Sequence, residues 1–355
     1  MKKIFAIVLC LVLCVCTLVS ILGCVKENTD DTIIITDMLG EKVEVKKNPT
    51  KVACVSRTTY DLLIAFGVGD CIDGVYYSLL ENEWAGIFDK DASLRYSCEY
   101  EESYETFISR GVDIVFAPEK YIADGLNKHG VKALNVSLYG KPNFSRYVYY
   151  FADMVKQIWD SEEVARRVDI WKGYMSSTID EIQTELVKHD EVKRTIFYVR
   201  GDKNRGIGYT DNAGAFAEYA YGVLGMDFLG NRFKSNKPSA EEISSQNPDV
   251  FVIGGIYQKT LENILETTEP YIYLDAVKNN QVYNIPIGLT MFEQISVFSP
   301  VFFADQANKL YPSYFNYDTK NMIINYSKEF FDVDLTNEEA ENMLNGLSRE
   351  GNLLA

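Results

Sequence analysis

Arginine and tyrosine side chains follow several of the apolar runs that the sequence predicts as β-strands. Together they suit a ligand with negative charge and apolar surface, because a guanidinium donates to anionic oxygens while phenol rings cover apolar groups. The candidate ligand contacts are Arg57, Tyr60, Tyr77, Tyr121, Arg200, Arg205, Tyr209, Tyr257 and Phe292. The same loops also carry Tyr76, Glu119, Lys120, Met291 and Glu293. The set predicts one ligand site, although each residue alone is equally typical of surface or packing.

Catalytic and metal-binding patterns are scarce in the chain. The two histidines, His129 and His189, lie where predicted helices end, and there a charged imidazole complements the helix dipole. We therefore expect no directly bound metal and no cofactor. The sequence has neither the Gly-x-Ser-x-Gly elbow of a hydrolase nor a phosphate-binding loop. We expect a binding protein rather than an enzyme, with an extracellular hydrolase as the rival.

The composition limits the number of domains and the kinds of ligand that we expect. The 355 residues are 47% hydrophobic and carry a formal net charge of −16. A chain of this length can form one large or two ordinary domains. Its acidic balance argues against nucleic-acid binding, which needs basic surface to displace counterions.

The N-terminal segment is typical of an export signal. A basic start is followed by an uncharged, mostly apolar run over residues 4–22 and then by a polar stretch. Ile21-Leu22-Gly23-Cys24 resembles a bacterial lipobox, with Leu22 where a smaller residue is more usual. We expect residues 1–23 to be removed, Cys24 to carry lipid at the outer face of the cell membrane, and residues 24–31 to form a tether. The alternative is a retained helical anchor, because about 20 apolar residues can span a membrane.

Three cysteines remain after this segment, at Cys54, Cys71 and Cys98. Their spacing is not that of a metal site, and their odd number allows one disulfide at most. A single disulfide and three buried thiols both stay open.

Two series of predicted strands alternate with helical stretches. The strands lie at residues 51–55, 72–75, 113–117, 132–136, 195–199, 249–253 and 281–285, after a short hairpin at residues 32–45. Strands that alternate with helices predict parallel sheets, so we expect an α/β fold.

The segment between the two series has a different pattern. Its apolar residues step by three or four, as on one face of a helix: Val164, Val168, Trp171, Met175, Ile179, Ile182 and Leu186. About 27 residues would give a helix of roughly 40 Å. Its position favours a helix that joins two lobes over a simple core helix. We predict an N-terminal lobe at 32–158, a linker helix at 159–190, a C-terminal lobe at 191–315 and a helical segment at 316–355.

A short phrase occurs once in each half. Ser103-Tyr104-Glu105-Thr106-Phe107 precedes one predicted strand, and Ser239-Ala240-Glu241-Glu242-Ile243 precedes another. In both, a glutamate follows the serine by two residues and an aspartate follows it by ten. This self-similarity predicts two lobes built on one plan, each with a glutamate at a helix start. Such a glutamate can also do no more than offset the helix dipole.

Taken in order, these features are similar to those of extracellular substrate-binding proteins of ABC importers for ferric siderophores, haem and cobalamin. Besides the two Ser-x-Glu phrases, the matching segments are residues 35–40, 49–52, 62–70, 276–283, 310–315 and 330–335. Asn280 stands where this family more often has glycine. The resemblance covers nearly the whole mature chain and rests on the ordered set rather than on one motif.

The resemblance implies two α/β lobes joined by one long rigid helix, with the ligand cleft between them and only a small tilt on binding. It implies that Glu105 and Glu241 dock onto arginines of a membrane permease, which works with an ATPase. The implied ligand is a metal chelate, first a ferric siderophore and then cobalamin or haem, bound by a monomer. A surface sensor that binds the same ligand without transport is the alternative from another class.

Overall fold

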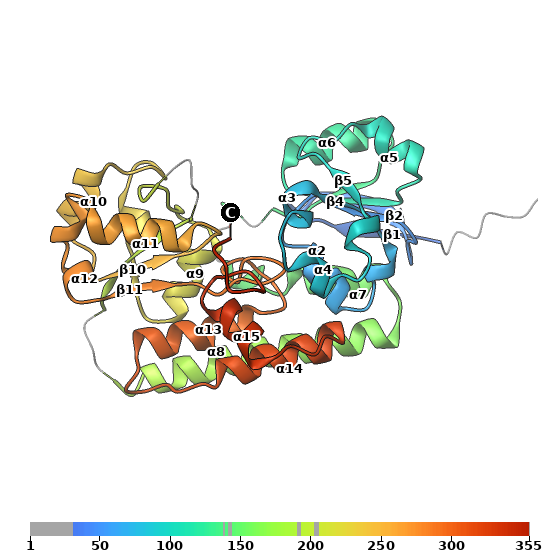
Figure 1. The fold of residues 1–355 in the computed structure, drawn as a ribbon. Coiled ribbons are helices and arrows are strands. Elements are labelled where there is room, and N and C mark those ends of the chain that lie inside the picture. Colours follow the sequence, from blue (N-terminus) through green and yellow to red (C-terminus); the bar gives the residue numbers. More distant parts are fainter. Residues whose placement is uncertain (1–30, 138, 141–143, 190–192, 202–205, 355) are drawn as a thin grey trace, which may run out of the picture.

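The computed structural model describes residues 31–137, 139–140, 144–189, 193–201 and 206–354. These residues form two α/β lobes joined by a long helix (Figure 1), which confirms the predicted fold class. None of the helices in this part of the chain is both long enough and apolar enough to cross a membrane. The predicted signal at residues 1–23 and the lipid attachment at Cys24 lie outside the described residues.

The N-terminal lobe is built on a parallel five-stranded sheet in the order β5-β4-β3-β6-β7. The strands are β3 (Val52–Cys54), β4 (Ile72–Tyr76), β5 (Tyr96–Cys98), β6 (Ile114–Ala117) and β7 (Ala133–Asn135). The helices are α2 (Tyr60–Ala65), η1 (Gly69–Cys71), α3 (Tyr77–Leu80), α4 (Ala85–Phe88), η2 (Ala92–Leu94), α5 (Tyr104–Arg110), α6 (Lys120–Lys128), η3 (Phe144–Arg146) and α7 (Tyr150–Ile158). An antiparallel hairpin of β1 (Thr32–Thr36) and β2 (Lys42–Lys46) precedes the sheet. Strands β3 and β6 are buried throughout, as in a parallel sheet covered on both faces.

The C-terminal lobe has a parallel four-stranded sheet in the order β11-β10-β8-β9. The strands are β8 (Thr195–Val199), β9 (Asp227–Phe228), β10 (Val250–Ile253) and β11 (Val282–Asn284). The helices are α9 (Phe216–Val223), η4 (Leu229–Arg232), α10 (Ala240–Gln246), α11 (Gln258–Thr267), η5 (Tyr271–Tyr273) and α12 (Asp275–Lys278).

The two sheets share one plan. In the N-terminal lobe β3, β6 and β7 lie side by side, and in the C-terminal lobe β8, β10 and β11 do so in the same order. The Asp113 carboxylate accepts hydrogen bonds from the backbone N–H of Thr50 and Lys51, at 2.9 and 3.1 Å, just before β3. Asp249 accepts one from the N–H of Thr195 at 2.7 Å, where β8 begins. The aspartate that ends each Ser-x-Glu phrase therefore ties two neighbouring strands together in its lobe.

A single helix, α8 (Glu162–Leu186), joins the lobes. At about 1.5 Å per residue it is about 37 Å long. Its first turn is capped by the Ser161 side chain, which accepts from the N–H of Val164, and is followed by two acidic residues that suit the positive end of the helix dipole. The helix lies inside the predicted 159–190 range. Helix α13 (Ser299–Leu310) packs on α8, and α14 (Thr319–Phe331) packs on α13 and on α15 (Asn337–Leu344).

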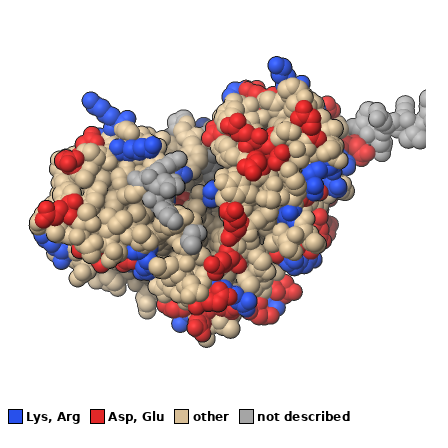
Figure 2. Space-filling view, turned by 45° about the horizontal axis from the view of Figure 1, so that its top comes forward, with Lys and Arg blue, Asp and Glu red and all other residues tan. Residues whose placement is uncertain are grey.

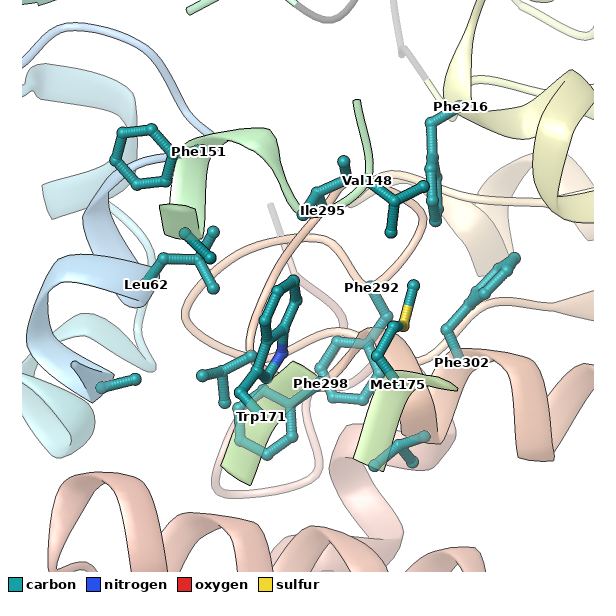
Figure 3. Packing of buried hydrophobic residues seen from close by; sticks show 14 of the residues in the cluster. Leu62, Val148, Phe151, Trp171, Met175, Phe216, Phe292, Ile295, Phe298 and Phe302 are labelled. Carbon is teal, nitrogen blue, oxygen red and sulfur yellow. The ribbon is translucent and has the colours of Figure 1, made fainter. Parts of the chain in front are cut away.

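One hydrophobic core runs from the first lobe through α8 into the second. Trp171 and Met175 of α8 lie between Leu62 on one side and Phe302 on the other (Figure 3). Trp171 is fully buried, and its Nε1 donates to the carbonyl of Ser296 at 3.2 Å. Parting the lobes widely would return this apolar surface to water at about 25 cal/mol per Å². The shared core therefore opposes a wide hinge motion.

The three cysteines that follow the N-terminal segment are free thiols. Burial raises the pKa of Cys54 and of Cys98 to about 12 in each case, so both stay protonated and poorly reactive. Of the two alternatives left open by the sequence, the structure has thiols and not a disulfide, with Cys71 only partly buried.

Candidate ligand-binding site

Two adjoining cavities of ≈470 and ≈570 Å³ lie between the lobes, and we call them together the cleft. Figure 2 shows the surface hollowed there, with acidic side chains gathered on the N-terminal lobe beside the hollow. Five residues border both cavities: Arg57, Tyr198, Arg200, Tyr209 and Gln294. The first cavity adds residues that include Tyr100, Glu119, Ser137, Tyr139, Asp211 and Glu293. The second adds residues that include Tyr77, Glu81, Glu83, Tyr257, Met291 and Leu354.

Loops at the carboxyl ends of parallel strands form most of the cleft. In the N-terminal lobe residues 55–58 follow β3, residues 118–119 follow β6 and residues 136–137 follow β7. In the C-terminal lobe Arg200 follows β8, and Tyr257 lies shortly after β10. The carboxyl ends of neighbouring parallel strands share one edge of a sheet, so both lobes present their loops to the same space.

Arg200 links the two lobes across the cleft. Its Nη1 lies 3.2 Å from Oδ1 of Asp211 and donates to the hydroxyl of Tyr209 at 3.2 Å. Its Nη2 donates to the hydroxyl of Tyr139, in the other lobe, at 2.9 Å. The guanidinium carbon lies 5.3 and 5.0 Å from the ring centroids of Tyr139 and Tyr209, within the range of cation–π attraction. Arg200 therefore holds two tyrosine rings and one carboxylate in a fixed arrangement.

Glu293 is a buried carboxyl in the cleft wall. Its Oε1 accepts from the N–H of Gly255 at 2.7 Å and from the hydroxyl of Tyr198 at 3.4 Å, while Oε2 has no partner among the described residues. A Cβ at Gly254 would lie 2.3 Å from Oε1, so this approach needs glycine. Burial raises the pKa of Glu293 to about 7. The cleft thus contains an acid that titrates near neutral pH.

We expect Glu293→Gln to stabilise the protein at pH 8 but not at pH 4. The folded pKa of about 7 lies above the usual 4.5. Between these pH values the folded chain binds more protons than the unfolded chain, so stability falls as pH rises. The full loss of stability that the buried Glu293 charge causes is present above pH 7. The cost is at most about 3 kcal/mol, and the amide keeps the hydrogen bond from Gly255 without the charge. Urea unfolding at both pH values measures the difference, and equal shifts at both would refute this role for the charge.

The structure brings five of the predicted ligand contacts together. Arg57, Tyr77, Arg200, Tyr209 and Tyr257 all line the cleft. Arg205 lies outside the described residues. Tyr121 is 57% exposed on α6, where its hydroxyl donates to Glu101, and it lines neither cavity. Of the further loop residues, Glu119, Met291 and Glu293 also line the cleft.

Two of the predicted contacts, Tyr60 and Phe292, line neither cavity, because both side chains are fully buried in the core. Tyr60 begins α2 and turns inward, where its hydroxyl donates to Asp89 at 2.6 Å. That carboxylate is also held by Arg95 at 3.0 Å. Phe292 stacks on Phe298 with 4.8 Å between ring centroids (Figure 3). The next residue in the chain, Glu293, lines the cleft.

We expect Tyr60→Phe to lower the free energy of unfolding by about 1–2 kcal/mol, because the buried Asp89 loses a hydrogen-bond donor. Ligand affinity should stay within twofold, since the ring is sealed in the core. Tyr209→Phe is the matched control: it removes one hydroxyl in the cleft and should weaken binding with little effect on stability. Denaturant melts and ligand titrations of both variants separate the roles, and a Tyr60→Phe protein with normal stability but weak binding would restore the sequence-based assignment.

Several residues that line the cleft are not among those predicted from the sequence. Tyr139 follows the predicted strand at 132–136 just as the chosen residues follow theirs, so the same rule would have found it. Tyr198 lies within β8, where only a view of the sheet shows which face meets the cleft. Asp211 carried no local signal, because its role comes from Arg200, eleven residues earlier in the chain.

The two predicted docking glutamates occupy equivalent places. Each is the second residue of its helix, after the N-cap residues Ser103 of α5 and Ser239 of α10. Both glutamates are exposed. Hydrogen bonds at the helix start hold both carboxyl pKa values below the usual range, so both are charged at neutral pH. In Figure 1 α5 and α10 lie at the tips of the two lobes, away from α8.

In the described part of the chain, no group of three or more His, Cys, Asp or Glu side chains is arranged to hold a metal ion. His129 caps the end of α6 and stacks on Tyr104, with 4.1 Å between ring centroids. His189 stacks on Tyr314 at 3.7 Å beyond the end of α8. Both imidazoles therefore lie at helix ends and pack on aromatic rings.

Solved structures of periplasmic solute-binding proteins, one of them from an ABC transporter, share this two-lobed fold. A periplasmic solute-binding protein from Veillonella parvula is 19% identical over 88% of this chain and 96% of its own, with a TM-score of 0.68. The molybdate periplasmic binding protein MolA of Haemophilus influenzae, bound to molybdate, is 14% identical over 86% and 99%, with a TM-score of 0.73. Helicobacter pylori CeuE, as a nickel–histidine complex, is 17% identical over 88% and 99%, with a TM-score of 0.69. No family model and no curated protein matches the sequence. At these identities the likeness establishes the fold.

Proposed function

We propose that this chain is the solute-binding component of an ABC importer and captures a metal chelate, first of all a ferric siderophore. The observation that carries the proposal is the cleft, which both lobes build from strand-end loops and which the Arg200 network spans. Its two cavities, ≈470 and ≈570 Å³, have the size of small-molecule sites. Two of the proteins with this fold are named with metal-containing ligands, molybdate and nickel–histidine.

Cobalamin or haem is the second candidate for the same role. Met291 and several tyrosines line the second cavity, and thioether and phenolate groups are axial ligands that haem iron accepts. The scarcity of histidine is therefore compatible with haem.

We further propose that the mature chain is a monomer held by lipid on Cys24 at the outer face of the cell membrane. The lipobox-like Ile21-Leu22-Gly23-Cys24 supports this, together with the polar residues that follow it. A tether of residues 24–31 would leave the lobes free to reach a membrane partner.

The partner is the permease of the importer, with its ATPase. Glu105 and Glu241 would dock onto arginines of the permease, because charged carboxylates at both lobe tips can form bidentate contacts and fix the orientation of the complex. Binding and delivery, without turnover, then describe the activity, so the protein is not an enzyme.

A binding screen tests the proposal. Purified mature chain is titrated with ferric siderophores, haem, cobalamin and uncomplexed metal salts, and quenching of Trp84, Trp159 and Trp171 reports binding. We expect one chelate class to bind with a Kd of about 1 μM or less and the chelate to be recovered unchanged. Tight binding of an uncomplexed divalent ion, with no chelate binding, would refute it.

A further inference from the structure

The charged side chains that line the cleft are mostly acidic. Five acidic side chains border it against two guanidinium groups among the described residues. The acidic side chains are Glu81, Glu83, Glu119, Asp211 and Glu293, and the guanidinium groups belong to Arg57 and Arg200. Glu293 contributes only part of a negative charge at neutral pH, because burial raises its pKa to about 7. From the sequence alone we expected the arginines to bind negative charge on the ligand. The excess of acidic over basic side chains in the cleft instead disfavours a negatively charged ligand.

One of the two arginines already has its counterion. Arg200 pairs with Asp211 at 3.2 Å, and its remaining donors reach the hydroxyls of Tyr139 and Tyr209. Arg57 lies 5.2 Å from the ring centroid of Tyr76 and has no ion pair within the described residues. A ligand that carried several negative charges would therefore find one uncompensated guanidinium among several carboxylates.

The rest of the wall suits a ligand without net negative charge. Tyrosine rings cover apolar groups and attract cations through their π faces. Glu293 adds a buried oxygen, Oε2, that has no partner in the described part of the chain and accepts from a ligand donor if the side chain turns slightly into the cleft. Arg57 can contact one metal-bound oxygen, because such oxygens stay electron-rich in a neutral chelate as well.

Building on the function proposed above, we propose that the cargo is a metal chelate whose net charge is zero or positive. In such a chelate the ligating groups just neutralise the metal, as three hydroxamate monoanions neutralise one ferric ion. Three catecholate dianions leave three negative charges on the same ion, and the cleft would disfavour that complex.

A charge series of one chelate tests the inference on the unmodified protein. The probes are the ferric complexes of one linear trihydroxamate with its terminal amine free, acetylated or succinylated, which carry one positive, no and one negative charge, and a ferric tricatecholate. We expect the cationic and neutral complexes to bind at least about tenfold more tightly than the succinylated one, and the tricatecholate to bind most weakly. Tightest binding of the succinylated complex or the tricatecholate would overturn the inference while the proposed function stands. Failure of all these complexes, together with failure of haem and cobalamin in the binding screen, would refute the proposed function itself.

Asp211→Asn provides a second reading in the same assay. It releases the charge of Arg200, so the preference for the cationic over the succinylated complex should fall at least about fivefold. Glu338→Gln, which removes an exposed carboxylate on α15, is the control and should leave the preference unchanged. An unchanged preference in Asp211→Asn would show that the charges in the cleft do not select the ligand. If this variant does not fold, the charge series on the unmodified protein decides the question.

Discussion

Reversing Glu105 and Glu241 together, to arginine, should abolish uptake while ligand affinity stays within twofold. Both carboxylates are exposed at the lobe tips and lie outside the cleft, so they are free to meet a partner and do not contact the ligand. Like charges placed opposite permease arginines cost several kcal/mol, which would lower uptake by about 100-fold or more. Each single reversal should give a smaller loss. Uptake of radiolabelled ferric chelate by cells that carry the importer measures the effect.

Glu338→Arg is a matched control for these reversals. Glu338 is also the second residue of an exposed helix start, after the N-cap Thr336 of α15. An arginine introduced at residue 338 therefore meets the positive end of a helix, as the arginines introduced at residues 105 and 241 do. This costs about 0.3–1 kcal/mol of folding stability. We expect normal uptake from this variant. Full uptake by the double reversal would remove the proposed docking role, and loss of ligand binding would place the two glutamates in the binding site instead.

The second large effect is expected for Arg200→Ala, which should weaken chelate binding by about 100-fold, or about 2.7 kcal/mol. The substitution releases Tyr139 and Tyr209 from their hydrogen bonds and leaves the partly buried Asp211 without its counterion. Arg200→Lys should restore little, because an ammonium cannot reach three partners in the plane of a guanidinium. Calorimetric titration with the chelate found in the screen gives the affinities.

Arg194→Ala controls for the loss of a half-buried arginine. Arg194 stands just before β8 as Arg200 stands just after it, and it packs over Tyr311 at 5.1 Å, far from the cleft residues along the strand. We expect this variant to lose some stability and to bind normally. Equal losses of affinity in the two variants would mean that Arg200 acts through the stability of the lobe and not through the cleft.

Sequence patterns were sufficient for the fold because they report local geometry. The 3.6-residue spacing from Val164 to Ile182 marks the buried face of α8, and every apolar residue on that stripe is buried. The aspartates ten residues after Ser103 and Ser239 lie at equivalent places in the two lobes and make the same strand-start hydrogen bonds. A repeated phrase thus predicted a repeated structure.

The site could be predicted only in part, because strand-end position does not decide which way a side chain points. Arg57 and Tyr60 follow the same strand, yet one faces the cleft and the other turns into the core toward Asp89. Phe292 and Glu293 are adjacent in an irregular loop and face opposite ways. The pairing of Arg200 with Asp211, which changes the charge expected of the ligand, depends on a side-chain contact that no periodicity records.

The most direct test is a calorimetric comparison of three ligands: a ferric chelate, the same chelator without metal, and ferric or divalent ions without chelator. The cleft should bind one chelate per chain, bind the metal-free chelator at least about tenfold more weakly, and show no saturable binding of the bare ions. The same chelate should bind about 100-fold more weakly to Arg200→Ala. Stoichiometric binding of a bare ion, or chelate binding that Arg200→Ala leaves unchanged, would contradict capture of a metal chelate in the cleft.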